Sequence, residues 1–165
     1  MTRIFISIGS NISRDENVRQ SVYFLEKYFS NLLLSSVYET EAVGFDGDDF
    51  FNLVVAVDTD QDLKTVRGWL QKIEEQQGRL RTQARFTPRT IDLDLLLYGN
   101  EIIKQQGFEI PRAEITEYAF VLKPLAEIAP AEQHPVTGYT YSQLWDEFDR
   151  EGQALTKIDF QWGRE

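Results

Sequence analysis

The N-terminal half of the chain alternates between extended and helical patterns of apolar residues. Ile4, Ile6 and Ile8 share one face of a predicted strand over 3–9. A helical spacing follows over about 15–30, with Asp15 as the expected N-cap residue. Segments 33–40 and 50–58 are rich in β-branched and aromatic residues, and they predict two more strands.

The same alternation continues through a second helix and a further strand. The helix spans about 61–77, and Gly78 is its expected stop. The strand spans 91–98 and follows an irregular segment that contains Pro88. The resulting order, β-α-β-β-α-β, is typical of a ferredoxin-like sandwich, in which an antiparallel sheet carries both helices on one face. We therefore expect an α+β fold of this kind.

The C-terminal third has a less regular pattern and predicts additions to that sandwich. We expect a short strand near 101–104, a short helix before Leu122, a helix around 141–151 and an extended piece near 156–162. No linker or internal repeat interrupts the chain. Its 165 residues predict a single domain over 1–165.

Composition excludes several kinds of site. The chain has no Cys, which excludes a disulfide framework, a thiolate metal site and a Cys nucleophile. His134 is the only histidine, which argues against His-based triads, and we expect it in a surface loop. No apolar run approaches the roughly 20 residues that cross a bilayer, and the N-terminus lacks a signal-peptide pattern. We therefore expect a cytoplasmic protein without a membrane partner.

The charge is strongly negative overall but locally positive. Seventeen basic and 27 acidic residues give a net charge of −10, which argues against a nucleic-acid partner. The segment 76–91 nevertheless holds four arginines and no acid. These are Arg79, Arg81, Arg85 and Arg89. Such a cluster predicts a local anionic ligand, and the alternative is surface ion pairing with the excess acids.

Two carboxylates follow the arginines directly. Asp92 and Asp94 are two positions apart on the predicted strand, so they share a face. Paired carboxylates repel unless a cation lies between them, and Mg²⁺ favours one or two carboxylates together with substrate phosphates. The sequence thus predicts a metal–nucleotide site without a Walker motif. The alternative is a pair of solvent-facing acids on an amphipathic strand.

A third group of residues is aromatic. Phe50 and Phe51 precede Asn52, and Phe120 follows much later in the chain. Aromatic rings with an adjacent amide can hold a flat heterocycle by stacking and paired hydrogen bonds. The alternative is ordinary core packing.

Six short motifs, in order, resemble one family. They are Ile8-Gly9-Ser10-Asn11, Val37-Tyr38-Glu39-Thr40, Phe51-Asn52, Glu74-Glu75-Gln76-Gln77-Gly78-Arg79, Pro88-Arg89-Thr90-Ile91-Asp92-Leu93-Asp94 and Phe120-Val121-Leu122-Lys123-Pro124-Leu125. Over roughly 3–148 the chain resembles the 6-hydroxymethyl-7,8-dihydropterin pyrophosphokinase family. The resemblance implies an enzyme that moves pyrophosphate from ATP to a pterin alcohol in folate biosynthesis.

The resemblance also implies roles for particular residues. Asp92 and Asp94 would bind two Mg²⁺ ions, and Arg79 and Arg89 would stabilise the transferring group. The remaining ATP contacts implied are Gln71, Arg81, Arg85, Leu95, Phe108 and Ile110, and we add Arg112 as a predicted phosphate contact. The pterin contacts implied are Thr40, Val43, Phe50, Asn52 and Phe120.

The chain departs from the family pattern on the ATP side. Arg112 and Ala113 stand where the family usually has His and an aromatic residue, and Tyr118 stands where it usually has Arg. Thr82 and Phe86-Thr87 are further departures. We expect weaker ATP binding, which Arg112 can partly offset by contacting a phosphate.

Three hypotheses follow from these residues. The leading one is a monomeric enzyme that takes ATP and a pterin. The second is a divergent relative that binds pterin or nucleotide without catalysis or acts on another substrate. The third, a ferredoxin-like RNA-binding module, is opposed by the charge of −10 and by the lack of a basic aromatic sheet motif.

Overall fold

The computed structural model describes residues 1–41, 48–78 and 91–163. A mixed fold is built on an antiparallel sheet with strand order β5-β1-β4-β3-β8, and β2 pairs with β4 beside this path. Its strands are β1 (Thr2–Ser10), β2 (Leu33–Leu34), β3 (Val37–Thr40), β4 (Phe50–Thr59), β5 (Asp92–Tyr98) and β8 (Leu155–Ile158). A separate hairpin pairs β6 (Ile103–Gln105) with β7 (Phe108–Ile110).

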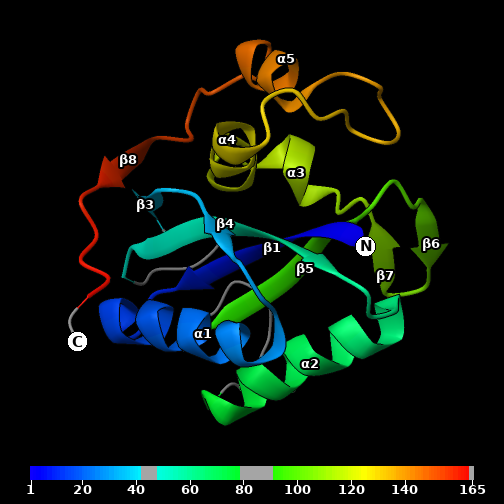
Figure 1. The fold of residues 1–165 in the computed structure, drawn as a ribbon. Helices are drawn as coiled ribbons and strands as arrows, with labels where there is room; N and C mark the ends of the chain where they lie inside the picture. The colour runs from blue at the N-terminus through cyan, green and yellow to red at the C-terminus, as the bar shows by residue number, and fades with distance from the viewer. Residues whose placement is uncertain (42–47, 79–90, 164–165) are drawn as a thin grey trace.

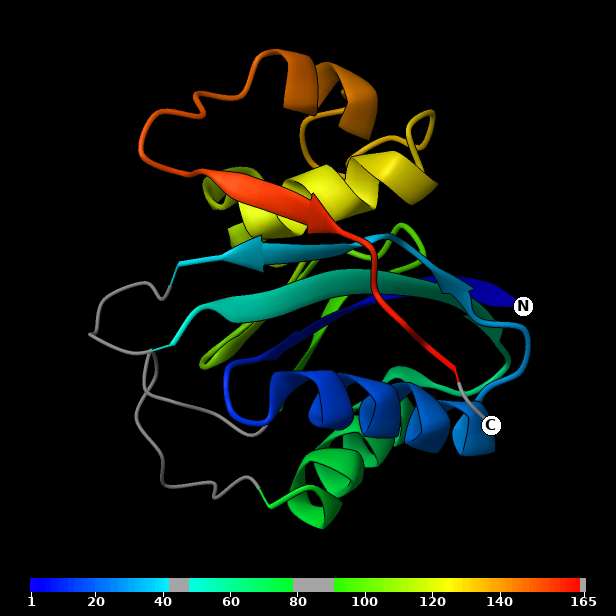
Figure 2. The same ribbon diagram turned by 90° about the vertical axis from the view of Figure 1, so that its left-hand side faces the viewer.

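Helices cover both faces of the sheet (Figures 1 and 2). On one face lie α1 (Arg14–Tyr28) and α2 (Leu63–Gln76). On the other lie α3 (Glu114–Glu117), α4 (Ala119–Ile128) and α5 (Tyr141–Asp146). Among the described residues no helix is both long and apolar enough to span a bilayer.

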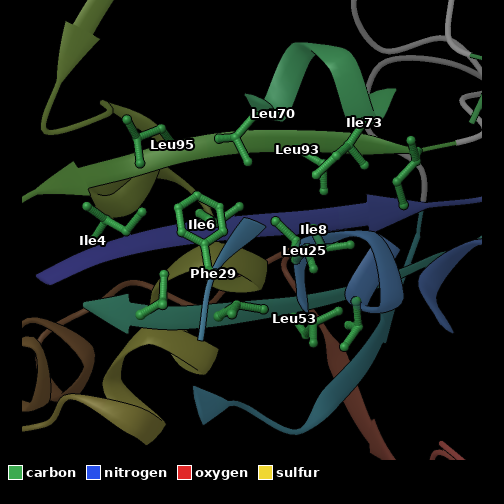
Figure 3. Packing of buried hydrophobic residues seen from close by; sticks show 14 of the residues in the cluster. Ile4, Ile6, Ile8, Leu25, Phe29, Leu53, Leu70, Ile73, Leu93 and Leu95 are labelled. Carbon is green, nitrogen blue, oxygen red and sulfur yellow. The ribbon is translucent and has the colours of Figure 1, made fainter. Parts of the chain in front are cut away.

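The alternation of side chains along each strand divides the core in two. Ile4, Ile6 and Ile8 of β1 pack with Leu25 of α1 and Ile73 of α2 on one side of the sheet (Figure 3). Phe5 of β1 and Val54 of β4 point the other way and pack with Leu122 and Leu125 of α4. Burial on both faces explains why β4 is almost wholly apolar.

Several predicted boundaries were wrong. Helix α1 begins after Ser13, so Asp15 lies in its first turn and is not the N-cap. The predicted strand over 33–40 is two strands, β2 and β3. The C-terminal helix ends at Asp146, short of 151. The predictions for β4, β5 and the Gly78 stop were confirmed, and Gly78 has the positive φ of 91° that favours glycine at such an end.

The predicted short helix before Leu122 is confirmed as α3, whereas helix α4 was not predicted. It begins at Ala119 and continues past Leu122 through Pro124 to Ile128. A proline inside a helix removes one hydrogen bond and normally disfavours it by about 3 kcal/mol. Here Val121, Leu122 and Leu125 are buried against the sheet, and this packing outweighs the local preference.

His134 is in a loop, but the expectation of a surface position was wrong. Its residue is only 7% exposed, and its ring lies against that of Tyr141 with centroids 6.1 Å apart. Its Nδ1 accepts backbone N–H groups from Val136 at 3.1 Å and Thr137 at 3.3 Å. Burial lowers the pKa of His134, and protonation of Nδ1 would also remove both hydrogen bonds.

This arrangement predicts a pH-dependent stability. Because the folded-state pKa of His134 lies below its unfolded value, the unfolded chain binds the proton more readily, and stability falls as pH drops below about 6.5. The His134→Asn variant keeps an acceptor that does not titrate. Urea unfolding of both proteins across roughly pH 7.5 to 5.5 should show a smaller acid-side loss in the variant. Parallel profiles would contradict the prediction, since all other groups titrate alike in both proteins.

Candidate active site

Polar residues gather on the sheet face that α3 and α4 cover, across three adjacent strands. In the sheet register, Gly9 of β1 lies opposite Asp92 of β5 on one side and opposite Asn52 of β4 on the other. Neighbouring strands are roughly 4.8 Å apart, so the Cα atoms of Asp92 and Asn52 are about 10 Å apart across Gly9. The predicted metal pair and the predicted heterocycle-binding amide therefore share one surface.

The amide of Asn52 is held in one orientation. Asn52 is 4% exposed, and its Nδ2 donates to Thr40 Oγ1 at 2.8 Å. Its Oδ1 lies against Gly9, where an added Cβ would be only 2.8 Å away. Phe50 lies close to the same point, with its Cδ1 3.7 Å from that Cβ position. The absence of a side chain at Gly9 thus leaves room for this arrangement.

The two aromatic residues come from different elements, Phe50 from β4 and Phe120 from α4. Phe50 alternates with the core-facing Phe51, so it shares the face of Asn52. Phe120, at the start of α4, stacks on Tyr118 with centroids 5.1 Å apart and planes inclined by 22°. Phe50 and Phe120 are both partly buried. The two aromatic residues predicted from the sequence thus lie on the same side of the sheet.

Asp92 and Asp94 also lie on this face, because Leu93 between them points into the other core. Burial and the charge of Asp92 are the main causes that together raise the pKa of Asp94 to about 7, and Glu74 and Glu114 act in the same direction. Arg112 opposes the shift, with its Nη2 4.0 Å from Asp94 Oδ1. Negative charge is thus in excess around Asp94, and a bound cation would reduce the repulsion between these carboxylates.

The donor set fits a hard cation that shares its coordination with substrate. Among the described residues, no group of three or more His, Cys, Asp or Glu side chains forms a metal cage. Two carboxylates are nevertheless enough for Mg²⁺, which keeps several waters and takes the remaining oxygens from phosphates. The pair therefore fits a cation that arrives with a nucleotide.

Glu74 was not assigned a role from the sequence, but it positions the aspartate pair. Its Oε2 accepts the backbone N–H of Leu93 at 2.7 Å, reaching from α2 to the outer edge of β5. Among the described strands β5 lies at the end of the sheet order, so none of them pairs with this edge. The side chain thus fixes the backbone between Asp92 and Asp94, a role that only the packing of α2 on β5 reveals.

Arg112 stands where the family pattern usually has His, and it contacts the carboxylates of Asp94 and Glu114. Its Nε and Nη2 donate to the two oxygens of Glu114 at 3.2 and 3.0 Å. Burial alone would lower the pKa of Arg112, but Glu114 and Asp94 raise it above its usual value, and the guanidinium stays charged. Beside it lies a cavity of about 510 Å³, also lined by Phe108, Ala113 and Tyr118.

The remaining predicted site residues lie apart from this surface or outside the described residues. Leu95 and Ile110 are buried in the core under α1 and α2. Phe108 lies beneath Arg67, whose Cζ is 3.6 Å from the ring centroid, and Gln71 is exposed on α2. Outside the described residues lie Val43, Arg79, Arg81, Thr82, Arg85, Phe86, Thr87 and Arg89.

Arg14, to which no role was assigned from the sequence, links the ends of β3 and β4 near Asn52. Its Nη2 lies 2.6 Å from Glu39 Oε2, and its Nη1 donates to the carbonyl of Asp49 at 3.0 Å. Its Cζ lies 3.9 Å from the centroid of Phe51, the register partner of Glu39. One guanidinium therefore links the end of β3 to the start of β4, next to Phe50.

Replacement of Arg14 by glutamine should weaken the pairing of β3 with β4 at this end of the sheet. We expect faster amide hydrogen exchange over 49–52 and a loss of about 1–2 kcal/mol in the free energy of unfolding, since an ion pair, a hydrogen bond and a stacked cation are lost together. Arg19→Gln is the matched control. Arg19 lies in the same helix as Arg14, stacks on Phe160 and donates to the carbonyl of Gln161. Equal exchange over 49–52 in both variants would refute the role of Arg14.

Comparison with known proteins gives one consistent result. The family described as 7,8-dihydro-6-hydroxymethylpterin-pyrophosphokinase (HPPK) matches residues 5–130. The 2-amino-4-hydroxy-6-hydroxymethyldihydropteridine pyrophosphokinase of Bacillus subtilis is 35% identical over 157 residues, which cover 93% of this chain and 89% of that protein. The protein of the same name from Haemophilus influenzae is 36% identical over 133 residues, covering 78% of this chain and 82% of that protein.

Solved structures agree in fold. Chains of Plasmodium falciparum HPPK-DHPS superpose with a TM-score of 0.70 for a triple mutant and 0.68 for the wild type, both with SDX-DHP. Sequence identities are 14% and 16%, over 88% and 89% of this chain. This chain spans 41% and 43% of those chains, and it likewise spans 20% of the folic acid synthesis protein fol1 of Pneumocystis carinii, at 34% identity over 87% of this chain. The chain belongs to the 7,8-dihydro-6-hydroxymethylpterin-pyrophosphokinase family.

Proposed function

We propose that this chain transfers pyrophosphate from ATP to the hydroxymethyl group of 6-hydroxymethyl-7,8-dihydropterin, with AMP as the second product, in folate biosynthesis. The family match over 5–130 supports the reaction. The observation that carries it to this chain is the register of Asp92, Gly9 and Asn52 on adjacent strands. That row provides carboxylates for the nucleotide side and an oriented amide for the pterin side, about 10 Å apart.

The pterin side is built to read a flat heterocycle. Asn52, oriented by Thr40 and Gly9, offers its amide edge for paired hydrogen bonds with the pterin. Phe50 and Phe120 supply rings on the same side of the sheet. With the heterocycle held there, its hydroxymethyl oxygen would point along the sheet toward the aspartates.

On the nucleotide side, Asp92 and Asp94 would hold two Mg²⁺ ions together with the phosphates of ATP. When bound, Mg²⁺ supplies neutralisation of the phosphate charge and fixes the phosphates for in-line attack. Arg112 lies next to Asp94 and lines the cavity at Phe108, which suits it for a phosphate contact. Arg79 and Arg89 would stabilise charge on the transferring group, and Gln71, Arg81 and Arg85 would hold the nucleotide.

The reaction itself is a displacement at the β-phosphorus. The hydroxymethyl oxygen forms a bond to that atom and loses its proton, while the bond from the β-phosphorus to the oxygen of the α-phosphate breaks and AMP leaves. Arginines and oriented carboxylates contribute by positioning and by charge stabilisation rather than by covalent chemistry. Ala113 and Thr82 remove contacts on the ATP side, so we expect a raised KM for ATP.

We also infer that the chain is one ferredoxin-like domain over 1–165. The sheet order β5-β1-β4-β3, with α1 and α2 on one face, supports this arrangement. Strand β8 extends the sheet beside β3, and the buried face of α4 ties the C-terminal third to β4.

The direct test is AMP release from purified protein supplied with MgATP and 6-hydroxymethyl-7,8-dihydropterin. We expect AMP to form only when the pterin is present, in equal amount to the pterin diphosphate. The control omits the pterin and measures simple ATP hydrolysis. Folded protein that binds the pterin by calorimetry but forms no AMP would overturn the proposed reaction and favour a non-catalytic relative.

A further inference from the structure

A cavity between β3, α4, α5 and β8 gathers positive charge on a strongly acidic chain. It has a volume of about 390 Å³, and its wall includes Lys123 of α4, Trp145 of α5 and Lys157 of β8. Arg150, between α5 and β8, adds a third cation, and the lining contains no Asp or Glu. With a net charge of −10 for the whole chain, three cations around one acid-free cavity are a marked local reversal.

Two of the cations lie over the ring of Trp145. The Cζ of Arg150 is 4.0 Å from the ring centroid, and its Nη2 donates to the Trp145 carbonyl at 2.8 Å. The Nζ of Lys123 is 5.2 Å from the same centroid. The indole therefore keeps two cations at the wall of the cavity, where a bound anion would be attracted to both.

Among the described residues, no carboxylate forms a close ion pair with these three cations. Across residues 1–41, 48–78 and 91–163, no carboxylate oxygen lies within 4.0 Å of the charged nitrogens of Lys123, Arg150 or Lys157. Glu127 interacts with Lys157 at longer range, but it already accepts hydrogen bonds from Tyr38 at 2.7 Å and from Ser36 Oγ at 2.8 Å. Within the lining of the cavity, the three cations therefore face no carboxylate.

We propose that this cavity binds a small organic phosphate monoester. A monoester carries a charge near −2 at neutral pH and offers three acceptor oxygens to the three cations of the lining, whereas a carboxylate carries −1 and offers two oxygens. The guanidinium and two ammonium groups can donate to its oxygens. The rings of Tyr38 and Trp145, with Leu155, provide an apolar wall for the organic part, and the volume is within the range of small-molecule sites.

The site stands apart from the proposed pyrophosphoryl transfer. Trp145, Arg150 and Lys157 lie beyond the residues 5–130 that the family matches, and none of the lining residues is among those assigned to the proposed reaction. The proposal therefore does not depend on the reaction at Asp92 and Asp94.

The test is a titration of the ¹⁵N-labelled full chain with phenyl phosphate, followed through the indole N–H signals of its three tryptophans. We expect a saturable shift of the Trp145 signal. Trp69, packed against Tyr28 and Phe29, should stay unchanged, as should Trp162, packed against Phe160. These two signals also report whether a variant remains folded. No saturable Trp145 shift up to about 10 mM, where even millimolar affinity would be evident, would overturn the proposal.

Variants identify the groups responsible. The double variant Lys123→Gln with Lys157→Gln should bind at least about tenfold more weakly, because two charge-assisted contacts are lost. Lys27→Gln is the matched control, since Lys27 lies 4.6 Å over the ring of Tyr23 on α1, and it should bind as the wild type does. Unchanged affinity in the double variant would refute the site. Equal affinity for phenylacetate, which carries a single carboxylate, would refute the preference for phosphate.

Discussion

Replacing Asp94 by asparagine is expected to reduce pyrophosphoryl transfer by about 10³-fold or more while leaving the fold intact. Loss of a metal-binding carboxylate removes several kcal/mol of charge stabilisation in the transition state, and each 1.36 kcal/mol is about tenfold in rate. The measurement is turnover of AMP formation at saturating MgATP and pterin. The control is Asp60→Asn, whose side chain is 73% exposed and lies in the loop after β4.

The same substitution should not destabilise the protein at pH 8. The folded-state pKa of Asp94 is about 7, above its usual value of 3.8, because burial and Asp92 disfavour the charged form. The unfolded chain therefore releases this proton more readily, and stability is lost as pH rises between those two values. Asparagine removes the unfavourable charge, so the variant should unfold at an equal or higher urea concentration than the wild type at pH 8.

These two results together separate catalysis from folding. Low turnover with retained stability would assign Asp94 to the chemistry. Near-normal turnover would refute the metal assignment, and a large loss of stability at pH 8 would contradict the account of its pKa.

Replacing Gly9 by alanine should reduce pterin affinity by about two orders of magnitude. The new Cβ would lie 2.8 Å from Asn52 Oδ1, closer than such contacts occur, so the amide must move. Its hydrogen bond to Thr40 and its alignment with the heterocycle would be lost together, and a site that reads a ligand by paired hydrogen bonds discriminates strongly against misalignment. Calorimetric titration with the pterin gives the dissociation constant directly.

Gly68 provides the matched control for Gly9. It lies inside α2, and a Cβ there would meet no atom within 4 Å. Gly68→Ala should therefore stabilise the protein by up to about 1 kcal/mol and leave pterin binding unchanged. If Gly9→Ala binds the pterin as tightly as Gly68→Ala does, Asn52 is not the residue that reads it.

The elements with strong local periodicity could be predicted from the sequence, and those without it could not. Strands β4 and β5 and helix α2 followed from spacing of apolar residues and from Gly78. The extent of α4 could not, because Pro124 suggests an end and only the buried face against the sheet overrides it. His134 looked like a loop residue, and its burial depends on Tyr141 and on two backbone donors around it.

That Asp92 and Asp94 share a face could be predicted from their spacing alone, because positions two apart on a strand always do. The family could also be predicted from the six short motifs, and the family match over 5–130 confirms it. Only the tertiary structure placed Gly9 between Asp92 and Asn52, linked Glu74 to Leu93, and brought Arg112 within 4.0 Å of Asp94. Spacing along one strand is a local property of the backbone. Register between strands and the reach of a helix to a sheet edge arise instead from packing among residues far apart in the chain.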